Sequence, residues 1–196
     1  MAAMLAAALA LSVVVRVYDA YGVSSDTLAK ARMAVERIMK DARVAVTWTA
    51  CPCAAPVSNG ELMLRIVSAS PASEPESLGF SYIDVERHRG TMATVFADRI
   101  GALAASVSID RGELLGRAIA HEISHLLIGT HDHERRGLMR GFWAPSDLAK
   151  QAVSEWTLLP GDRIRIHQAL AVRLLESAPP VVVTADADAA ADVSAQ

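Results

Sequence analysis

The chain of 196 residues has no excess of basic charge and few aromatic side chains. Its 19 Lys and Arg stand against 22 Asp and Glu, for a formal net charge of −3, and aromatic residues make up only 5% of the chain. A nucleic-acid-binding surface needs a basic stripe, and stacking on bases needs exposed rings. No segment carries a basic stripe, and only three Tyr, three Phe and three Trp are available for stacking, so we expect no nucleic-acid partner.

Long hydrophobic runs and internal repeats are also missing. Even counted on to Val15, the apolar start of the chain is shorter than the ~20 residues of a membrane-spanning helix. No repeat of fixed period is visible, which argues against a solenoid. With 52% hydrophobic residues, the chain can bury one sizeable core. We therefore expect one domain, no stable membrane span and a monomer.

Cysteine is scarce as well. Cys51 and Cys53 are the only two, and they form a C-P-C segment. A disulfide between cysteines this close would strain the ring that it closes. We therefore expect two thiols without a mutual bridge.

The two ends of the chain differ in composition from the rest. Residues 1–12 are apolar and alanine-rich, with A-x-A-type sites around Ala8 to Ala10, although the segment has no Lys or Arg. We expect a signal peptide and an exported protein, secreted or periplasmic. The alternatives are a start codon placed too late or the leading helix of a cytoplasmic protein. Residues 178–196 are small and acidic without periodicity, which predicts a disordered tail after a domain at 13–177.

Hydrophobic periodicity predicts an α/β domain. A strand at 13–19, a helix capped by Ser24 or Ser25 and a strand at 44–50 indicate a βαβ unit with parallel strands. Further strands are expected at 62–67, 80–85 and 91–97, the last leading to the helix described next. Two amphipathic helices are expected at 146–156 and 161–177.

The most informative segment is an H-E-x-x-H motif formed by His121, Glu122 and His125. Positions four apart lie on one face of a helix, so both imidazoles can reach one metal ion. Glu122 then projects to the flank where a water on the metal would lie. This arrangement is typical of zinc hydrolases, in which the carboxylate acts as general base.

The surrounding residues favour a helix that carries the motif. Asp110 as N-cap and Glu113 three residues later have the spacing of a capping box, and Gly129 is suited to end the helix. Catalytic zinc needs a third protein ligand, which His131 or His133 can supply from the following loop. Asp132 between them is a weaker alternative.

Here the chain resembles the metzincin zinc proteases, whose signature is H-E-x-x-H-x-x-G-x-x-H followed by a methionine turn. His131 falls at the family spacing, and the segment GLM places Met139 at the turn, but Ile128 stands where the signature has glycine. The chain is still more similar to predicted secreted metzincin-like proteins of bacteria, with the pattern H-E-x-G-H-L-L-L-G-x-x-x-H-S-x-x-G-I-M-R. That pattern makes His133 the third ligand. We favour this assignment and keep His131 as the alternative third ligand.

The resemblance covers roughly residues 13–150, through the segments VRVYD, WTACP, LGFSYID and ATVFADR. It implies a zincin-like α+β fold with a mixed twisted sheet, Zn²⁺ as cofactor and Met139 as an apolar floor below the metal. It also implies that a strand within 79–97 pairs with a peptide or protein substrate. The alternative is that this strand is only part of the core of the sheet and binds no substrate.

We therefore expect a zinc-dependent metalloendopeptidase that attacks peptide bonds with a zinc-activated water and Glu122 as general base. Two alternatives stay open, because the motif specifies water activation and not the substrate. One is a zinc-binding module without proteolytic activity. The other is a zinc hydrolase of a non-protein amide.

Overall fold

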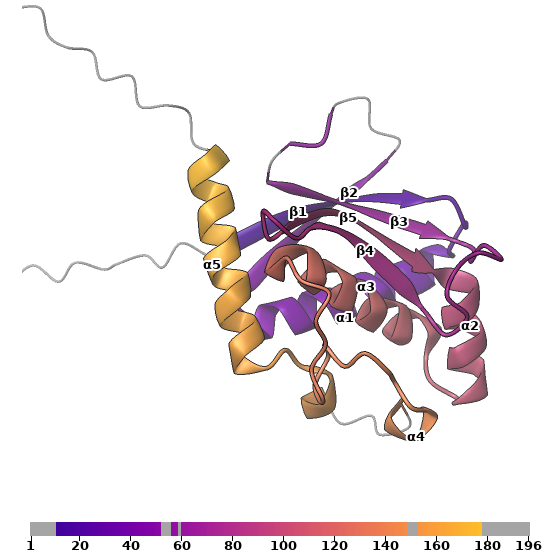
Figure 1. Ribbon diagram of the computed structural model, residues 1–196. Helices are drawn as coiled ribbons and strands as arrows, with labels where there is room; N and C mark the ends of the chain where they lie inside the picture. Colours follow the sequence, from indigo (N-terminus) through magenta and orange to yellow (C-terminus); the bar gives the residue numbers. More distant parts are fainter. Residues whose placement is uncertain (1–10, 52–55, 59, 149–152, 178–196) are drawn as a thin grey trace, which may run out of the picture.

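The computed structural model describes residues 11–51, 56–58, 60–148 and 153–177 (Figure 1). Five strands form one sheet in the order β2-β1-β3-β5-β4. All neighbours are parallel except β4, which lies at one edge, antiparallel to β5. The expected mixed sheet is thus confirmed, with strands β1 (Leu11–Asp19), β2 (Val44–Ala50), β3 (Glu61–Val67), β4 (Gly79–Asp84) and β5 (Arg89–Phe96).

The first part of the chain forms the expected βαβ unit. Helix α1 (Ser25–Asp41) begins after Ser24, whose side chain accepts a hydrogen bond from the Thr27 amide. Strands β1 and β2, which α1 connects, pair in parallel. The apolar residues of α1 recur at helical spacing and bury one face of it, made of Ala31, Ala34, Val35, Ile38 and Met39.

Two details of the helices differ from the expectation. The strand at 91–97 does not lead directly into the H-E-x-x-H helix, because α2 (Ala97–Ser106) lies between them and buries Ile100 and Ala104 one turn apart. The single helix expected at 146–156 is instead α4 (Pro145–Leu148) and the 3-10 helix η1 (Val153–Trp156), with residues 149–152 not described.

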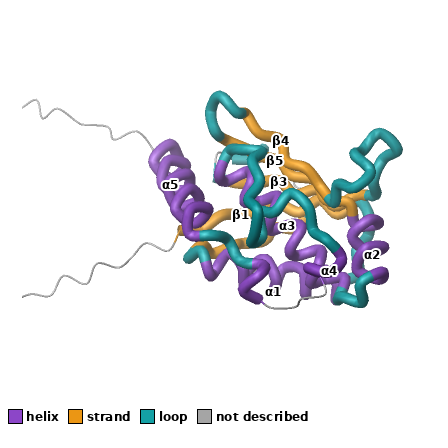
Figure 2. The backbone as a smooth tube through the Cα atoms, turned by 60° about the horizontal axis from the view of Figure 1, so that its bottom comes forward, coloured by secondary structure: helices purple, strands orange, loops and turns teal. Residues whose placement is uncertain are grey.

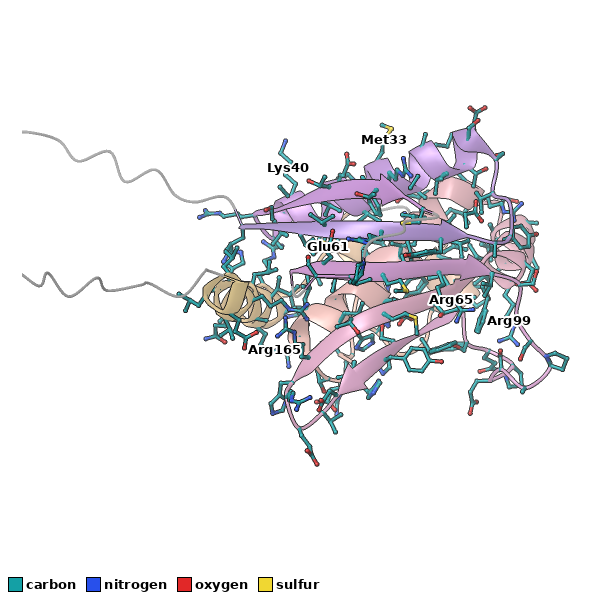
Figure 3. All side chains as sticks on the ribbon, turned by 90° about the horizontal axis from the view of Figure 1, so that it is seen from above. Met33, Lys40, Glu61, Arg65, Arg99 and Arg165 are labelled. Carbon is teal, nitrogen blue, oxygen red and sulfur yellow. The ribbon has the colours of Figure 1, made fainter. Side chains whose placement is uncertain are left out.

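The molecule has two layers. The described helices lie on one side of the sheet, with α3 (Arg111–Ile128) against β4 and β5 and α5 (Pro160–Ser177), the expected last helix, across one end (Figures 1 and 2). The opposite face of the sheet carries Glu61 and Arg65 of β3 (Figure 3). Within the described ranges, no helix has the length and apolar character needed to cross a membrane.

Three expectations concern residues at or beyond the edges of the described ranges. Cys51 is disulfide-bonded, which contradicts the expected free thiol; Cys53, the only other cysteine in the sequence, lies outside the described residues. Residues 1–10 of the expected signal peptide and the expected tail at 178–196 also lie outside the described residues.

The end of α3 gives a test of the packing. Gly129 has a φ of 76°, and a Cβ atom there would lie 2.1 Å from the main-chain carbonyl carbon of His88. We expect Gly129→Ala to lower the free energy of unfolding by more than ~2 kcal/mol, because backbone strain and the collision add. Gly22→Ala is the matched control, since Gly22 has a φ of 78° but nothing within 4 Å of its Cβ position. Urea unfolding should show a loss of about 1 kcal/mol for the control, and equal losses would contradict the close approach.

Candidate metal centre

Helix α3 is the framework of the site. Asp110 accepts a hydrogen bond from the Glu113 amide at the N-terminus, and Gly129 ends the helix in a left-handed conformation, both as predicted. All side chains from Leu114 to Leu127 are buried, because α3 packs against the sheet and against α1, α2 and α5. A helix enclosed on all sides holds the side chains that it carries in fixed positions.

The structure brings His121, His125 and His133 together. Nε2 of His125 lies 3.0 Å from Nε2 of His121 and 3.2 Å from Nε2 of His133. The first two rings lie one turn apart on α3, and the third comes from the loop that returns after Gly129. The three residues form a cluster able to hold a metal ion. His131, the other predicted ligand, is exposed and lies outside the cluster.

The hydrogen bonds of these rings fit a metal ion. Nδ1 of His121 lies 2.9 Å from the Leu138 carbonyl oxygen, and Nδ1 of His125 lies 2.8 Å from that of Thr130. A carbonyl oxygen only accepts, so each Nδ1 carries the hydrogen and each Nε2 keeps a lone pair. The pKa of His121 is lowered to about 3 and that of His125 to about 4, mainly because both rings are buried. Both rings are therefore neutral at pH 7.

Two neutral Nε2 atoms with lone pairs cannot donate a hydrogen bond to each other. A shared cation would account for their close approach. Tetrahedral zinc with ligand nitrogens at about 2.0–2.1 Å would place these nitrogens ~3.3 Å apart. The observed distances of 3.0 and 3.2 Å lie near this value. The donor set and its spacing thus fit zinc.

Glu122 is buried, with 8% of its surface exposed. Its Oε2 accepts a hydrogen bond of 2.7 Å from the hydroxyl of Ser81, which lies on the edge strand β4. Burial raises the pKa of Glu122 to about 7, although the hydrogen bond from Ser81 acts to lower it. A carboxyl group with this pKa can both take up and release a proton near neutral pH.

Met139 lies in the turn that follows the histidine loop and is buried. The preceding residue, Leu138, accepts the hydrogen bond of His121 and donates its own amide to the Thr157 carbonyl. The turn is therefore fixed against the histidine cluster from one side and against Thr157, the residue after η1, from the other. The role of Met139 as an apolar floor stays a prediction.

Sequence reasoning missed the groups that orient the site. The carbonyl groups of Leu138 and Thr130 carry no signal in the sequence, because every residue has one. Ser81 does leave a weak signal, since it is a polar residue at an inward position of a strand.

A cleft of about 1030 Å³ borders His121, Glu122 and His133. Its remaining walls include the start of β4 and many apolar side chains, and the ring of Trp143 meets the His121 ring edge-on at 5.7 Å. The apolar part of the lining includes Pro75, Leu78, Ala102, Leu103, Ala118, Phe142, Trp143 and Pro145. Such a cleft can enclose an extended chain with an apolar side chain beside the histidines.

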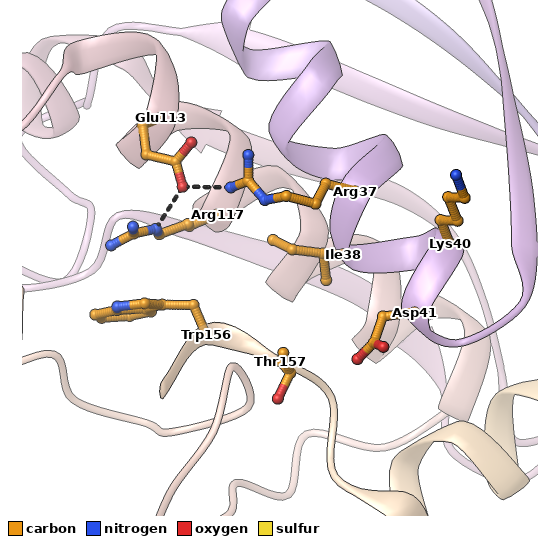
Figure 4. A pocket seen from close by; sticks show the side chains of 8 residues that line it. All are labelled: Arg37, Ile38, Lys40, Asp41, Glu113, Arg117, Trp156 and Thr157. Atoms are coloured by element: carbon orange, nitrogen blue, oxygen red, sulfur yellow. Dashed lines mark hydrogen bonds and ion pairs between the residues drawn. The ribbon is translucent and has the colours of Figure 1, made fainter. Parts of the chain in front are cut away.

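A second cavity of about 390 Å³ lies between α1, α3 and η1 and contains none of the histidines (Figure 4). In it, Glu113 accepts hydrogen bonds from Arg37 and Arg117, at 2.6 and 2.9 Å. The guanidinium groups of Arg117 and Arg140 lie 4.4 and 4.9 Å from the centroid of the Trp156 ring. This cation–π stack ties the helix that carries the motif to the loop that follows it.

Comparisons with known proteins agree with this geometry. No family model matches the sequence, and no curated protein matches it significantly. Among solved structures, archaemetzincin from Methanopyrus kandleri is similar with a TM-score of 0.52 and 13% sequence identity, over 82% of this chain and 96% of that one. The chain has a zincin-like fold. Metalloproteinase-II from Bacteroides fragilis is similar with a TM-score of 0.51 and 12% identity, over 82% of this chain.

This chain spans 54% of the Bacteroides fragilis chain, so it corresponds to about half of that protein. At identities this low, the structural similarity establishes the zincin-like fold alone. The activity has to be argued from the site. The resemblance to metzincins in the sequence is thus confirmed at the level of the fold.

Proposed function

We propose that this protein is a zinc-dependent peptidase. The observation that carries the proposal is the convergence of three imidazole Nε2 atoms, from His121, His125 and His133, in a cleft that also contains the buried carboxyl group of Glu122. Three nitrogen ligands with a fourth position left for water are typical of catalytic zinc. The zincin-like fold supports the same conclusion.

Each side chain has a separate role in this proposal. His121, His125 and His133 hold the ion through Nε2, and the Leu138 and Thr130 carbonyls keep two of the rings in the required tautomer. Zinc supplies Lewis acidity, which makes water more acidic and polarises a carbonyl group. Glu122 takes the proton of the attacking water and passes it to the leaving amine.

Strand β4 is our candidate for binding the substrate main chain. It is an edge strand of the sheet, whereas β5 is enclosed between β3 and β4. Gly79 at its start lines the cleft together with Leu78 and Glu122. The free edge of β4 can therefore pair with an extended peptide, whose scissile bond then lies next to Glu122.

Peptide hydrolysis tests the proposal directly. We expect the zinc-loaded protein to cleave members of a broad peptide library, to lose this activity when a chelator removes the metal, and to regain it when zinc is added back. Short N-acyl amides are assayed in parallel. Cleavage of the amides alone would favour a hydrolase of a non-protein amide, and bound zinc without any turnover would favour a binding module.

The expectation of a monomer stays a prediction.

We further propose that the protein is exported. The apolar start of the sequence and the disulfide at Cys51 support export, because disulfides persist in oxidising compartments. The full chain expressed in a bacterial host should lose its first residues, as seen in the mass of the mature protein. An intact chain confined to the cytoplasm would contradict export.

A further inference from the structure

The first part of strand β4 turns the small residues Gly79 and Ser81 toward α3, and Phe80 and Tyr82 away from it. Phe80 and Tyr82 are 37% and 51% exposed, whereas Ser81 between them is buried. Inward positions of a strand are normally apolar, and a buried hydroxyl needs a hydrogen-bond partner. The partner of Ser81 is Glu122 on α3. The inward position of Ser81 is therefore matched to the carboxyl group and not to a hydrophobic neighbour.

We propose that Ser81 is a positioning residue for Glu122, which holds Oε2 so that Oε1 stays available in the cleft. This inference rests on the proposed peptidase function. Oε1 accepts no hydrogen bond from the described residues, while Oε2 lies 2.7 Å from the Ser81 hydroxyl. One oxygen is therefore anchored, and the other is left for a water molecule.

The hydroxyl of Ser81 can serve the carboxyl group throughout a proton transfer. Its oxygen lies 2.7 Å from Oε2 and 2.9 Å from the main-chain oxygen of Glu122. It donates to Oε2 while the carboxylate is ionised. Once Oε1 has taken a proton from water, Oε2 is still an acceptor, and the Ser81 hydroxyl continues to donate to it. Oε2 thus keeps a partner in both states, and the carboxyl group need not move.

Gly79 completes this arrangement on the same face of β4. A Cβ atom at Gly79 would lie 3.2 Å from both Cγ and Oε1 of Glu122, and 2.6 Å from the Thr94 carbonyl oxygen. The missing side chain leaves space at Oε1, and Ser81 two residues later supplies the anchor at Oε2. The strand that would pair with the substrate therefore also sets the direction of the general base.

The test compares zinc-loaded wild type with Ser81→Ala, Ser81→Thr and Ser124→Ala. Ser124 is the matched control, because its hydroxyl is equally buried but bonds to the Ala120 carbonyl within α3. We expect Ser81→Ala to lower kcat about 10- to 100-fold, as misplacement of a catalytic group does, with KM and zinc affinity unchanged. Ser81→Thr keeps the hydroxyl and should retain most of kcat, and Ser124→Ala should match wild type.

Crystal structures of wild type and Ser81→Ala give a second readout that does not depend on turnover. We expect the Glu122 carboxyl group to leave its position in Ser81→Ala and to keep it in Ser81→Thr. A wild type that cleaves no substrate would contradict the peptidase proposal, and the structures would still decide the role of Ser81. An unmoved carboxyl group in Ser81→Ala, or a kcat within twofold of an active wild type, would overturn the inference.

Discussion

Replacing His133 by alanine is expected to remove zinc from the protein, whereas replacing His131 is expected to leave it bound. Nε2 of His133 lies 3.2 Å from Nε2 of His125 inside the cluster, and His131 lies outside it. Even the loss of an outer partner of a zinc ligand lowers metal affinity about 10- to 100-fold. Loss of a ligand itself should therefore weaken zinc binding by more than ~100-fold.

The measurement is the zinc content of each purified variant at pH 7, followed by competition with a chelator of known affinity. His131→Ala is the matched control, since it removes the same side chain two residues earlier in the same loop. Loss of zinc in His131→Ala with retention in His133→Ala would reverse the assignment. The metzincin spacing, in which His131 is the ligand, would then outweigh the geometry.

Glu122→Gln is expected to abolish hydrolysis while zinc stays bound. The amide can still accept the hydrogen bond of Ser81, but it cannot take a proton from water. General acid–base catalysis contributes about 10²- to 10⁴-fold to rate, so kcat should fall by about that factor. Glu113→Gln, the same change earlier in α3 and outside the cleft, is the control. Near-normal turnover by Glu122→Gln with full zinc content would remove Glu122 from the reaction.

The same variant also tests the pKa of Glu122 in the metal-free protein. Burial raises this pKa from 4.5 in the unfolded chain to about 7 in the folded one. The folded protein therefore loses stability as pH rises from 4.5 to about 7. Over this range the unfolded chain has released the Glu122 proton, whereas the folded protein still holds it. Above that range wild type should be less stable than Glu122→Gln by about 3 kcal/mol.

Denaturant unfolding of the two metal-free proteins at pH 5 and pH 8 measures this difference. The histidines titrate in both proteins, so their contribution largely cancels in the comparison. We expect a small difference at pH 5 and a clear advantage of Glu122→Gln at pH 8. A difference that does not change between the two pH values would show that the Glu122 carboxyl group has an ordinary pKa.

Much of the fold follows from local patterns in the sequence. The strands and α1 appear close to their predicted positions, because alternation and helical spacing depend on neighbouring residues. Helix α2 was missed within the short stretch between β5 and Asp110. The stretch at 146–156 was predicted as one helix, whereas its described parts are the end of α4 and the 3-10 helix η1. The errors thus lie where tertiary packing competes with weak local signals.

The sequence by itself determined the helix that carries His121, Glu122 and His125, because caps and a repeat of 3.6 residues set its limits and the spacing of its side chains. Only the tertiary structure decided that His133 and not His131 joins the cluster, since the return of a loop depends on distant contacts. It also decided that Ser81 meets Glu122, because a strand 41 residues away in the chain must pack against α3 before the two can form a hydrogen bond.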